Sequence, residues 1–148
     1  MRTLLNLFVS LSVLLGPTLA FAQAPAVKKP TQEQLKQMFK DHEYDKKKFD
    51  ALKESNQWIL LHFFADWCFT CQAQQLQTYE MFVRTKEFPS INLVMADYDN
   101  EKKLRATFKV NRQSMFILMQ GPNERARLDG VSDRQQIVDW IEKFLPDT

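Results

Sequence analysis

The chain has two cysteines, and their spacing of three residues constrains the fold more than any other feature. Cys68 and Cys71 follow an apolar run from Trp58 to Phe64, which predicts a buried strand. We expect the second half of the motif to form the first turn of a helix, where residues i and i+3 lie on one face, roughly 5–6 Å apart. Because this separation matches the Cα distance of a disulfide, a C-x-x-C at a strand-to-helix junction indicates a dithiol site.

The two thiols are expected to have different roles because they lie at different depths in the helix. A helix N-terminus offers unpaired N–H groups and a partial positive charge, which favour a thiolate over a thiol. Cys68 is nearer the helix start and is the predicted nucleophile, whereas Cys71 lies one turn inside and is the predicted resolving thiol. Asp66, two residues before Cys68, is either an exposed turn residue or a carboxylate that raises a thiol pKa.

The residues around this motif resemble the active site of the thioredoxin family. The resemblance rests on Ala65, Asp66, Trp67 and Cys68, followed by two residues and Cys71, and it extends more loosely over roughly the last two-thirds of the chain. It is closest to the soluble periplasmic thioredoxin-like domains, including the C-terminal domain of the transmembrane reductase DsbD. The resemblance implies an α/β fold with a mixed sheet of about four strands flanked by helices. It also implies thiol–disulfide oxidoreductase activity, with no organic cofactor.

Periodicity along the chain predicts the same order of elements, preceded by an extra N-terminal helical segment. Thr31 begins a capping box before the first helix, and Ser132 begins another before the last. Asp99 and Asn100 are expected to cap the short helix between the second and third strands. The expected elements are helical pieces within 31–52, strands at 58–64, 91–98, 115–119 and 125–129, and helices at 69–83, 101–109 and 132–145.

The helix that follows the motif is expected to bury its apolar side chains and expose its glutamines. The apolar positions at helical spacing predict the core face: Phe69, Ala73, Leu76, Tyr79 or Glu80, and Val83. The glutamines predict a neutral, polar outer face: Gln72, Gln74, Gln75 and Gln77.

His62 lies in the predicted strand six residues before Cys68, where the resembling family usually has a buried Asp that relays a proton to or from the resolving thiol. Alternation puts His62 on the strand face shared with Trp58, Leu60 and Phe64. One interpretation is acid–base catalysis, because a histidine titrates near neutrality. The other is a core histidine satisfied by a backbone carbonyl. The sequence leaves both open, and His62 is a candidate catalytic residue.

The loop before the third strand departs from the family pattern. The resembling family has a cis-proline there, facing the dithiol, whereas this chain has Ser114. A cis bond before a non-proline residue costs roughly 2.5–4 kcal/mol, so we expect a trans or reshaped loop. Ser114 could hydrogen-bond a thiolate, and the cysteines could be more open to a metal or cluster. Together with Gln113 and Trp67, Ser114 is a candidate substrate-binding residue.

The first 22 residues have the pattern of a secretory signal. Arg2 supplies a positive start, residues 4–15 form an apolar region, and residues 20–22 fit the small-x-small cleavage pattern. The alternative is an uncleaved membrane anchor, but the apolar stretch is short for a span and Pro17 interrupts it. Cleavage implies export to an oxidising compartment such as the periplasm. The predicted division of the chain is a signal peptide (1–22), a flexible linker (23–30) and a thioredoxin-like domain (31–148).

We therefore expect an exported, monomeric thiol–disulfide oxidoreductase that reduces protein disulfides and receives electrons from a membrane thiol donor. The net charge is +2, and loss of Arg2 with the signal leaves +1, so electrostatics give no argument for a nucleic-acid partner. The alternative is a thioredoxin-like binding module whose cysteine pair is structural or binds a metal or cluster. A disulfide closing so small a loop would constrain the unfolded chain little. Neither His62 nor His42 has the spacing of a zinc ligand beside the cysteines.

Overall fold

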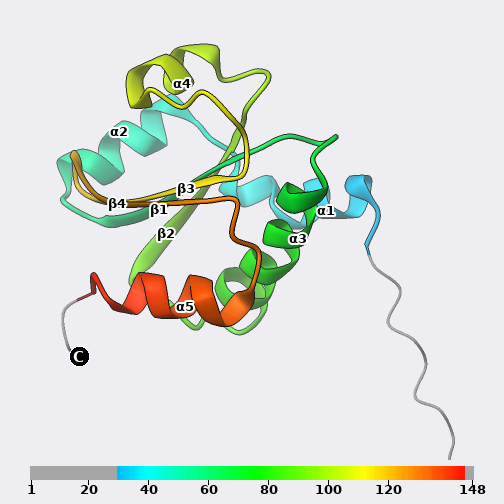
Figure 1. Cartoon of the computed structure of the whole chain (residues 1–148). Helices are drawn as coiled ribbons and strands as arrows, with labels where there is room; N and C mark the ends of the chain where they lie inside the picture. Colours follow the sequence, from blue (N-terminus) through cyan, green and yellow to red (C-terminus); the bar gives the residue numbers. More distant parts are fainter. Residues whose placement is uncertain (1–29, 146–148) are drawn as a thin grey trace, which may run out of the picture.

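The computed structural model describes residues 30–145, so the predicted signal peptide and residues 23–29 of the predicted linker lie outside the described part. The described residues form a mixed four-stranded sheet with helices on both faces (Figure 1). This confirms the predicted α/β architecture, including the extra helical segment before the first strand. No helix within residues 30–145 combines the length and apolar character that a membrane span requires.

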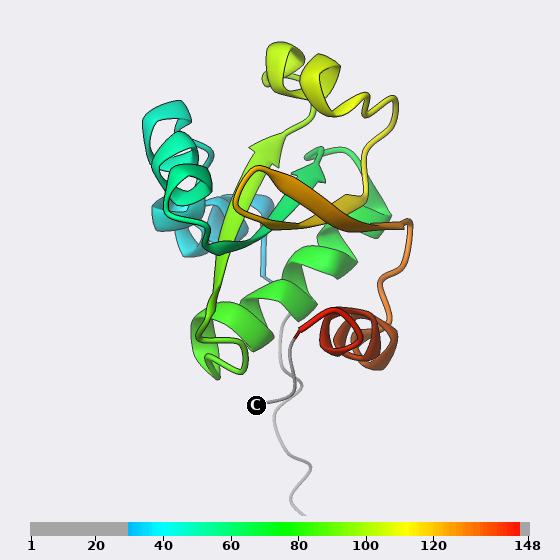
Figure 2. The same ribbon diagram turned by 90° about the vertical axis from the view of Figure 1, so that its left-hand side faces the viewer.

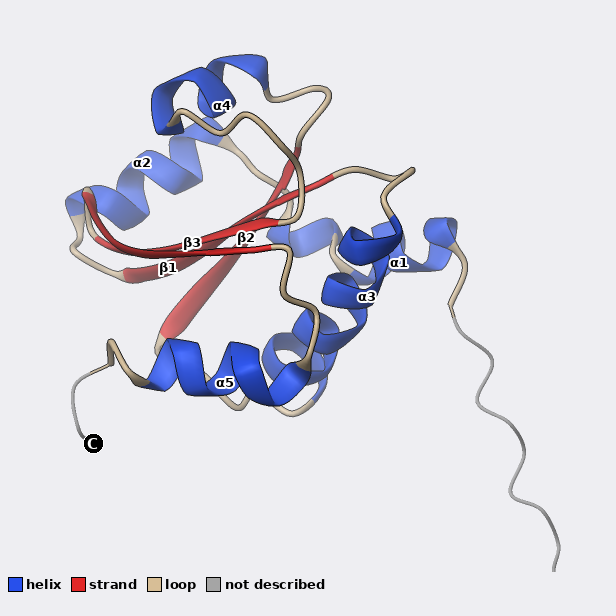
Figure 3. Cartoon of the chain, viewed as in Figure 1, coloured by secondary structure: helices blue, strands red, loops and turns tan. Residues whose placement is uncertain are grey.

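The elements alternate between helices and strands over most of the chain (Figure 3). In chain order they are α1 (Gln32–Met38), the 3-10 helix η1 (Lys40–His42), α2 (Lys46–Glu54), β1 (Trp58–Phe64), α3 (Phe69–Thr78), the π-helix η2 (Tyr79–Arg84), β2 (Ile91–Asp97), α4 (Lys102–Phe108), β3 (Met115–Gln120), β4 (Asn123–Asp129) and α5 (Arg134–Glu142).

The strand order is β2-β1-β3-β4, with β1 parallel to β2 and antiparallel to β3. β3 and β4 form an antiparallel hairpin. β1 is a central strand and is apolar at every position except His62, as a strand buried on both faces requires. Because β1 leads directly into the cysteine motif, the motif lies at one end of the sheet.

Two apolar layers enclose the sheet. Figure 2 shows the helices on both sides of the strands. One layer joins the sheet to α1, η2 and α5 through Leu35, Met81 and Ile137. The other joins the opposite face to α2 and α4 through Phe49 and Leu104. Figure 1 shows α2 and α4 on one side of the strands and α3 and α5 on the other.

His62 lies on the strand face shared with Trp58, Leu60 and Phe64, as alternation predicted, and α3 covers this face. Leu60, two residues earlier, belongs to the apolar layer on this face. The His62 ring is 4.3 Å from the ring of Phe116 between centroids, and its Nε2 is 3.0 Å from Gln74 Oε1 of α3. The histidine is therefore enclosed between the sheet and the helix that carries the cysteines.

The cap of the first helix was predicted correctly and the cap of the last was not. Thr31 forms the predicted capping box with Gln34. At α5, however, the cap is Asp133, whose carboxylate accepts the Gln136 N–H at 3.0 Å. Ser132 is wrong as the cap because the helix begins one residue later, and aspartate is as good a cap as serine.

The prediction that Asp99 and Asn100 cap α4 is also wrong. The N-cap position is Glu101, which makes no side-chain cap. Asp97 instead accepts the N–H of Asp99 at 2.8 Å and that of Asn100 at 3.2 Å. These residues form an Asx turn at the end of β2. The side chain of Asn100 donates to Asp97 Oδ2 and that of Asp99 accepts from Trp67 Nε1, so both have partners other than the first turn of α4.

The predicted faces of α3 are wrong at three positions. Phe69 is 85 % exposed, whereas Gln74 and Gln75 are 0 % and 3 % exposed. The face of α3 that meets the sheet is the one that carries Cys71, and residues three and four positions later lie on the same face. Phe69, two positions before Cys71, therefore points away from the core. The helical winding continues to Arg84, but it changes from α to π after Thr78.

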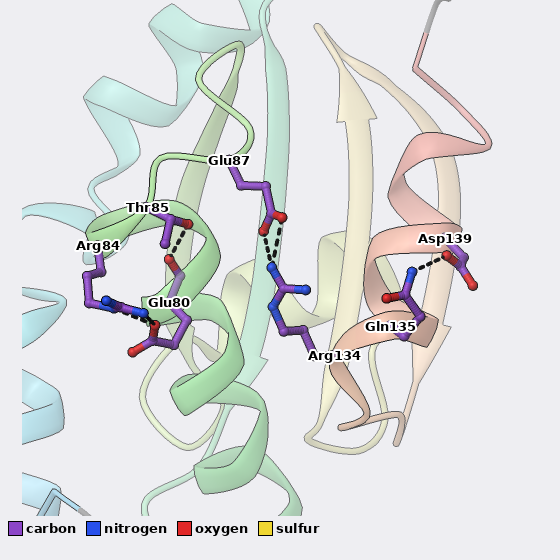
Figure 4. A network of polar contacts seen from close by, with 7 residues as sticks. All are labelled: Glu80, Arg84, Thr85, Glu87, Arg134, Gln135 and Asp139. Atoms are coloured by element: carbon purple, nitrogen blue, oxygen red, sulfur yellow. Dashed lines mark hydrogen bonds and ion pairs between the residues drawn. The ribbon is translucent and has the colours of Figure 1, made fainter. Parts of the chain in front are cut away.

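Polar contacts at the surface attach α5 to the segment between η2 and β2 (Figure 4). One guanidinium nitrogen of Arg134 donates to both carboxylate oxygens of Glu87, at 2.7 and 2.6 Å. Exposed ion pairs of this kind contribute about 0–1 kcal/mol. They orient the start of α5, while the buried face of the helix supplies the larger part of its attachment.

Gly121 in the β3–β4 turn is a position where a side chain cannot be accommodated. Its φ is +55°, and an added Cβ would lie 2.7 Å from Asn56 Oδ1 and 3.0 Å from the Lys53 carbonyl. Gly130 has a φ of +68° but open space around it. We expect Gly130→Ala to lower the free energy of unfolding by about 1 kcal/mol, and Gly121→Ala by about 3 kcal/mol, because only the latter adds a steric clash. Urea denaturation of both variants tests this, and equal losses would contradict it.

Candidate active site

The two cysteines lie at the start of α3, just beyond the end of β1. Cys68 is the N-cap of the helix, and its Sγ accepts the Cys71 N–H at 3.2 Å. Both are free thiols, 6 % exposed at Cys68 and fully buried at Cys71. The predicted dithiol at a strand-to-helix junction is therefore present, with Cys68 as the sulfur nearer to solvent.

Ser114 faces both sulfurs from the loop before β3. Its Oγ is 3.2 Å from Cys68 Sγ and 3.1 Å from Cys71 Sγ, so one hydroxyl can donate to either sulfur. Its φ is +63°, and the described residues contain no cis peptide bond. The peptide bond before Ser114 is therefore trans, which is one of the two expected alternatives, and the hydroxyl is within hydrogen-bonding distance of either sulfur.

The surroundings give the two thiols different acidities. Burial raises the pKa of Cys68, but hydrogen bonds from the Cys71 thiol and N–H, the Ser114 hydroxyl and the Gln113 side chain outweigh it and lower this pKa. Burial and the neighbouring Cys68 raise the pKa of Cys71 to about 11. In the reduced protein the negative charge therefore belongs on Cys68. This asymmetry supports the predicted roles of nucleophile and resolving thiol.

Two aromatic side chains flank Cys68 at the surface. Trp67 is 60 % exposed and is held by a 2.8 Å hydrogen bond from its Nε1 to Asp99 Oδ2. Phe69 is more exposed still, and its position here could not be inferred from helical periodicity. Gln113 lies close enough to Cys68 to affect its pKa. Of the predicted substrate-binding residues, Ser114 and Gln113 thus lie beside Cys68, and Trp67 precedes Cys68 in the chain. Their contact with substrate stays a prediction.

Asp66 connects the motif to the N-terminal helical segment. Its carboxylate forms an ion pair with Lys36 of α1 at 2.6 Å, and its backbone carbonyl accepts Gln72 Nε2 at 3.1 Å. The carboxylate is therefore neutralised by a partner outside the dithiol. This pairing opposes the interpretation of Asp66 as a charge that acts on the thiols.

His62 is fully buried and its only described hydrogen bond is to the side chain of Gln74, not to a backbone carbonyl. Burial lowers the pKa of His62 to about 4, although the hydrogen bond that the ring makes to Gln74 Oε1 acts in the opposite direction. The ring is therefore neutral at neutral pH. Among the described residues its hydrogen bonds reach the cysteines only through Gln74 and Ser114, and direct acid–base catalysis by His62 stays a prediction.

Gln74 is the residue of this site that sequence reasoning missed. It is fully buried and contacts His62, Ser114 and Val131. The signal that could have found it is its position three residues after Cys71, since residues three apart share a helix face.

Residues 30–145 contain no group of three or more His, Cys, Asp or Glu side chains arranged to hold a metal ion. A cavity of about 510 Å³ lies between η1, α2 and β2, and none of the predicted site residues lines it.

A family model described as Thioredoxin matches residues 38–143, which include every residue of this site. The chain belongs to the thioredoxin family. The match confirms the predicted thioredoxin-like fold and identifies the chain as a thiol–disulfide oxidoreductase of this family, acting on protein thiols and disulfides.

Individual thioredoxins are distant relatives of this chain. A thioredoxin of Chlamydia pneumoniae is 28% identical over 85 residues, which are 57% of this chain and 80% of that protein. A thioredoxin H-type of Fagopyrum esculentum is 27% identical over 101 residues, 68% of this chain and 84% of that protein. Among solved structures, mitochondrial thioredoxin 3 of Saccharomyces cerevisiae in its oxidised form has a TM-score of 0.62 and 16% identity, covering 72% of this chain and 99% of that one. That structure supports the fold alone.

Proposed function

We propose that this thioredoxin-family protein is an exported reductase of protein disulfides that works as a monomer in the periplasm and is re-reduced by a membrane thiol donor. The observation that carries the reductase role is the dithiol itself, in which one hydroxyl and one backbone N–H favour a thiolate on Cys68 while Cys71 keeps its proton. The signal-like pattern of residues 1–22 supports export.

The proposed reaction has two thiol–disulfide exchanges. Cys68 thiolate attacks one sulfur of the substrate disulfide, the substrate S–S bond breaks, and the departing substrate thiolate takes up a proton. Cys71 then loses its proton to the second departing thiolate and attacks Cys68 Sγ. The products are the Cys68–Cys71 disulfide and two substrate thiols. Two electrons have moved to the substrate, so two electrons and two protons from the membrane donor must restore the dithiol.

The raised pKa of Cys71 fits the order of these steps. A protonated Cys71 cannot attack before the mixed disulfide has formed, and in the meantime its thiol can donate to the Cys68 thiolate. When Cys68 becomes part of the mixed disulfide, its negative charge is gone and one cause of the raised pKa of Cys71 is removed. Resolution is then easier than in the free dithiol.

The equilibrium reduction potential of the Cys68–Cys71 pair, measured in glutathione or dithiothreitol buffers beside an insulin-reduction assay, tests this function. The variant with both cysteines changed to serine serves as the blank. A potential of about −270 mV with insulin turnover supports a reductase, whereas a potential of about −180 mV would indicate an isomerase and one of about −120 mV an oxidant. A very low potential without turnover would overturn the enzymatic role and leave a structural disulfide. Metal analysis of protein purified without oxidation tests the metal-binding alternative.

Export and the donor require separate measurements. Fractionation of cells that express the full chain should place the protein in the periplasm, and deletion of residues 2–22 should keep it in the cytoplasm. Size-exclusion chromatography with light scattering tests the monomer. A Cys71→Ser variant cannot resolve a mixed disulfide, so it should accumulate as a dithiothreitol-sensitive adduct with its partners.

A further inference from the structure

Gln74 is a buried amide whose every polar group has a partner. It offers two N–H donors and one strong acceptor, and it lies in the middle of α3 with no exposed surface. Burying such an amide without partners would cost roughly 1–3 kcal/mol. Its hydrogen bonds therefore decide which surrounding groups must stay in place.

Two backbone carbonyls fix the orientation of this amide. Gln74 Nε2 donates to the Ser114 carbonyl at 3.2 Å and to the Val131 carbonyl at 2.9 Å. Because a carbonyl can only accept, both must receive N–H bonds, and this leaves Oε1 as the atom that faces His62. His62 Nε2, 3.0 Å from Oε1, must then be the donor. The ring is the Nε2–H tautomer, and its Nδ1 has no partner among the described residues.

The contact with Ser114 reaches the dithiol. Ser114 has a φ of +63°, a left-handed conformation that costs roughly 1–2 kcal/mol for a residue with a side chain. Its carbonyl accepts two bonds, from the Gly130 N–H at 2.9 Å and from Gln74 Nε2. In the conformation held by these bonds, Ser114 Oγ lies between the two sulfurs.

We propose that Gln74, whose amide oxygen accepts the His62 Nε2–H, is a positioning residue that holds the Ser114 hydroxyl between the sulfurs of Cys68 and Cys71. Gln74 touches neither sulfur in the described contacts and acts through Ser114. Helix α3, which carries Cys71, thereby also fixes the Ser114 hydroxyl that faces this cysteine. The inference rests on the proposed function, because it concerns the reactivity of the same dithiol.

The rate at which iodoacetamide alkylates Cys68 in the reduced full-length protein, measured between pH 5 and 9, tests this role. Ser114→Ala removes the hydroxyl and should slow alkylation at low pH about tenfold, by raising the pH at which Cys68 ionises. Gln74→Met, close in volume to glutamine, should slow it in the same way. Alkylation of the double variant should be no slower than that of Ser114→Ala alone, because both changes remove the same contact, the one between the Ser114 hydroxyl and Cys68 Sγ.

Gln75→Met is the matched control. Gln75 is the next residue of the same helix, is also buried, and its Oε1 has no described partner. It should alkylate at the wild-type rate. If Gln74→Met folds and alkylates within twofold of wild type across the pH range, Gln74 only packs, and the inference is overturned. Alkylation needs no disulfide substrate, so absence of insulin turnover in the wild type would overturn the proposed function without deciding this inference.

The wild-type protein provides a second measurement that does not depend on a variant folding. Long-range ¹H–¹⁵N spectra of uniformly labelled protein distinguish the two neutral tautomers of His62. We expect the Nε2–H tautomer. An Nδ1–H tautomer would require Gln74 to donate to His62, which would withdraw a donor from Ser114 or Val131, and would overturn the proposal.

Discussion

When the reduced protein meets iodoacetamide at pH 7, Cys68 should be alkylated at least about 100-fold faster than Cys71. The pKa of Cys71 is raised to about 11, whereas that of Cys68 lies below its ordinary value of 9.0. Two pKa units correspond to a factor of about 100 in the fraction of reactive thiolate when both groups are mostly protonated. Cys68 is also the more accessible sulfur.

A quenched time course, followed by digestion and mass spectrometry of the peptide that contains both cysteines, measures this ratio. The rate at Cys68 should rise tenfold per pH unit below its pKa and level off above it. In urea the two cysteines should react at similar rates, because the environment that separates them is lost. Equal rates in the folded protein, or faster reaction at Cys71, would contradict the assignment of Cys68 as the nucleophile.

The parts of the site that could be predicted from the sequence are those that depend on local geometry. The cysteine spacing specifies a dithiol wherever a strand leads into a helix, and α3 begins at the residue after Cys68. Alternation along β1 gave the correct face for His62. Ser114 was found instead through the family resemblance, because it occupies the position where that family has a proline facing the dithiol. The left-handed conformation that brings its hydroxyl between the two sulfurs was not foreseen.

The missed features depend on contacts between distant segments. The partners of Gln74 lie 12, 40 and 57 residues away in sequence, so a helical pattern that sorts residues by polarity placed it on the outer face. Phe69 was assigned to the core for the same reason. The pattern records which residues are apolar, but the face of α3 that meets the sheet is set by Cys71, and this leaves Phe69 beside the reactive sulfur. Polarity therefore predicted the wrong environment for both residues, because Gln74 is a buried polar residue of the site and Phe69 is an exposed apolar residue next to Cys68.

Acidification should destabilise the protein through His62 by about 3 kcal/mol between pH 6.5 and pH 4. The pKa of His62 is lowered from 6.5 to about 4 because the ring is fully buried, and the hydrogen bond with Gln74 only partly offsets this. Below pH 6.5 the unfolded chain takes up a proton that the folded protein does not bind until the pH approaches 4. The unfolding free energy contributed by His62 is therefore complete above pH 6.5 and falls as the pH falls, by about 1.4 kcal/mol per pKa unit.

His62→Gln isolates this contribution from the titration of the carboxylates. A glutamine amide can replace His62 Nε2 as the donor to Gln74 Oε1, but it does not titrate in this range. Urea denaturation at pH 7 and pH 4 should show the wild type losing about 3 kcal/mol more than the variant. His42→Gln, which replaces the other histidine of the chain outside this network, serves as the matched control. If the losses of unfolding free energy between pH 7 and pH 4 differ by less than about 1 kcal/mol between the wild type and His62→Gln, His62 is protonated or hydrated in the folded state. The assignment of a neutral His62 as the donor to Gln74 would then be wrong.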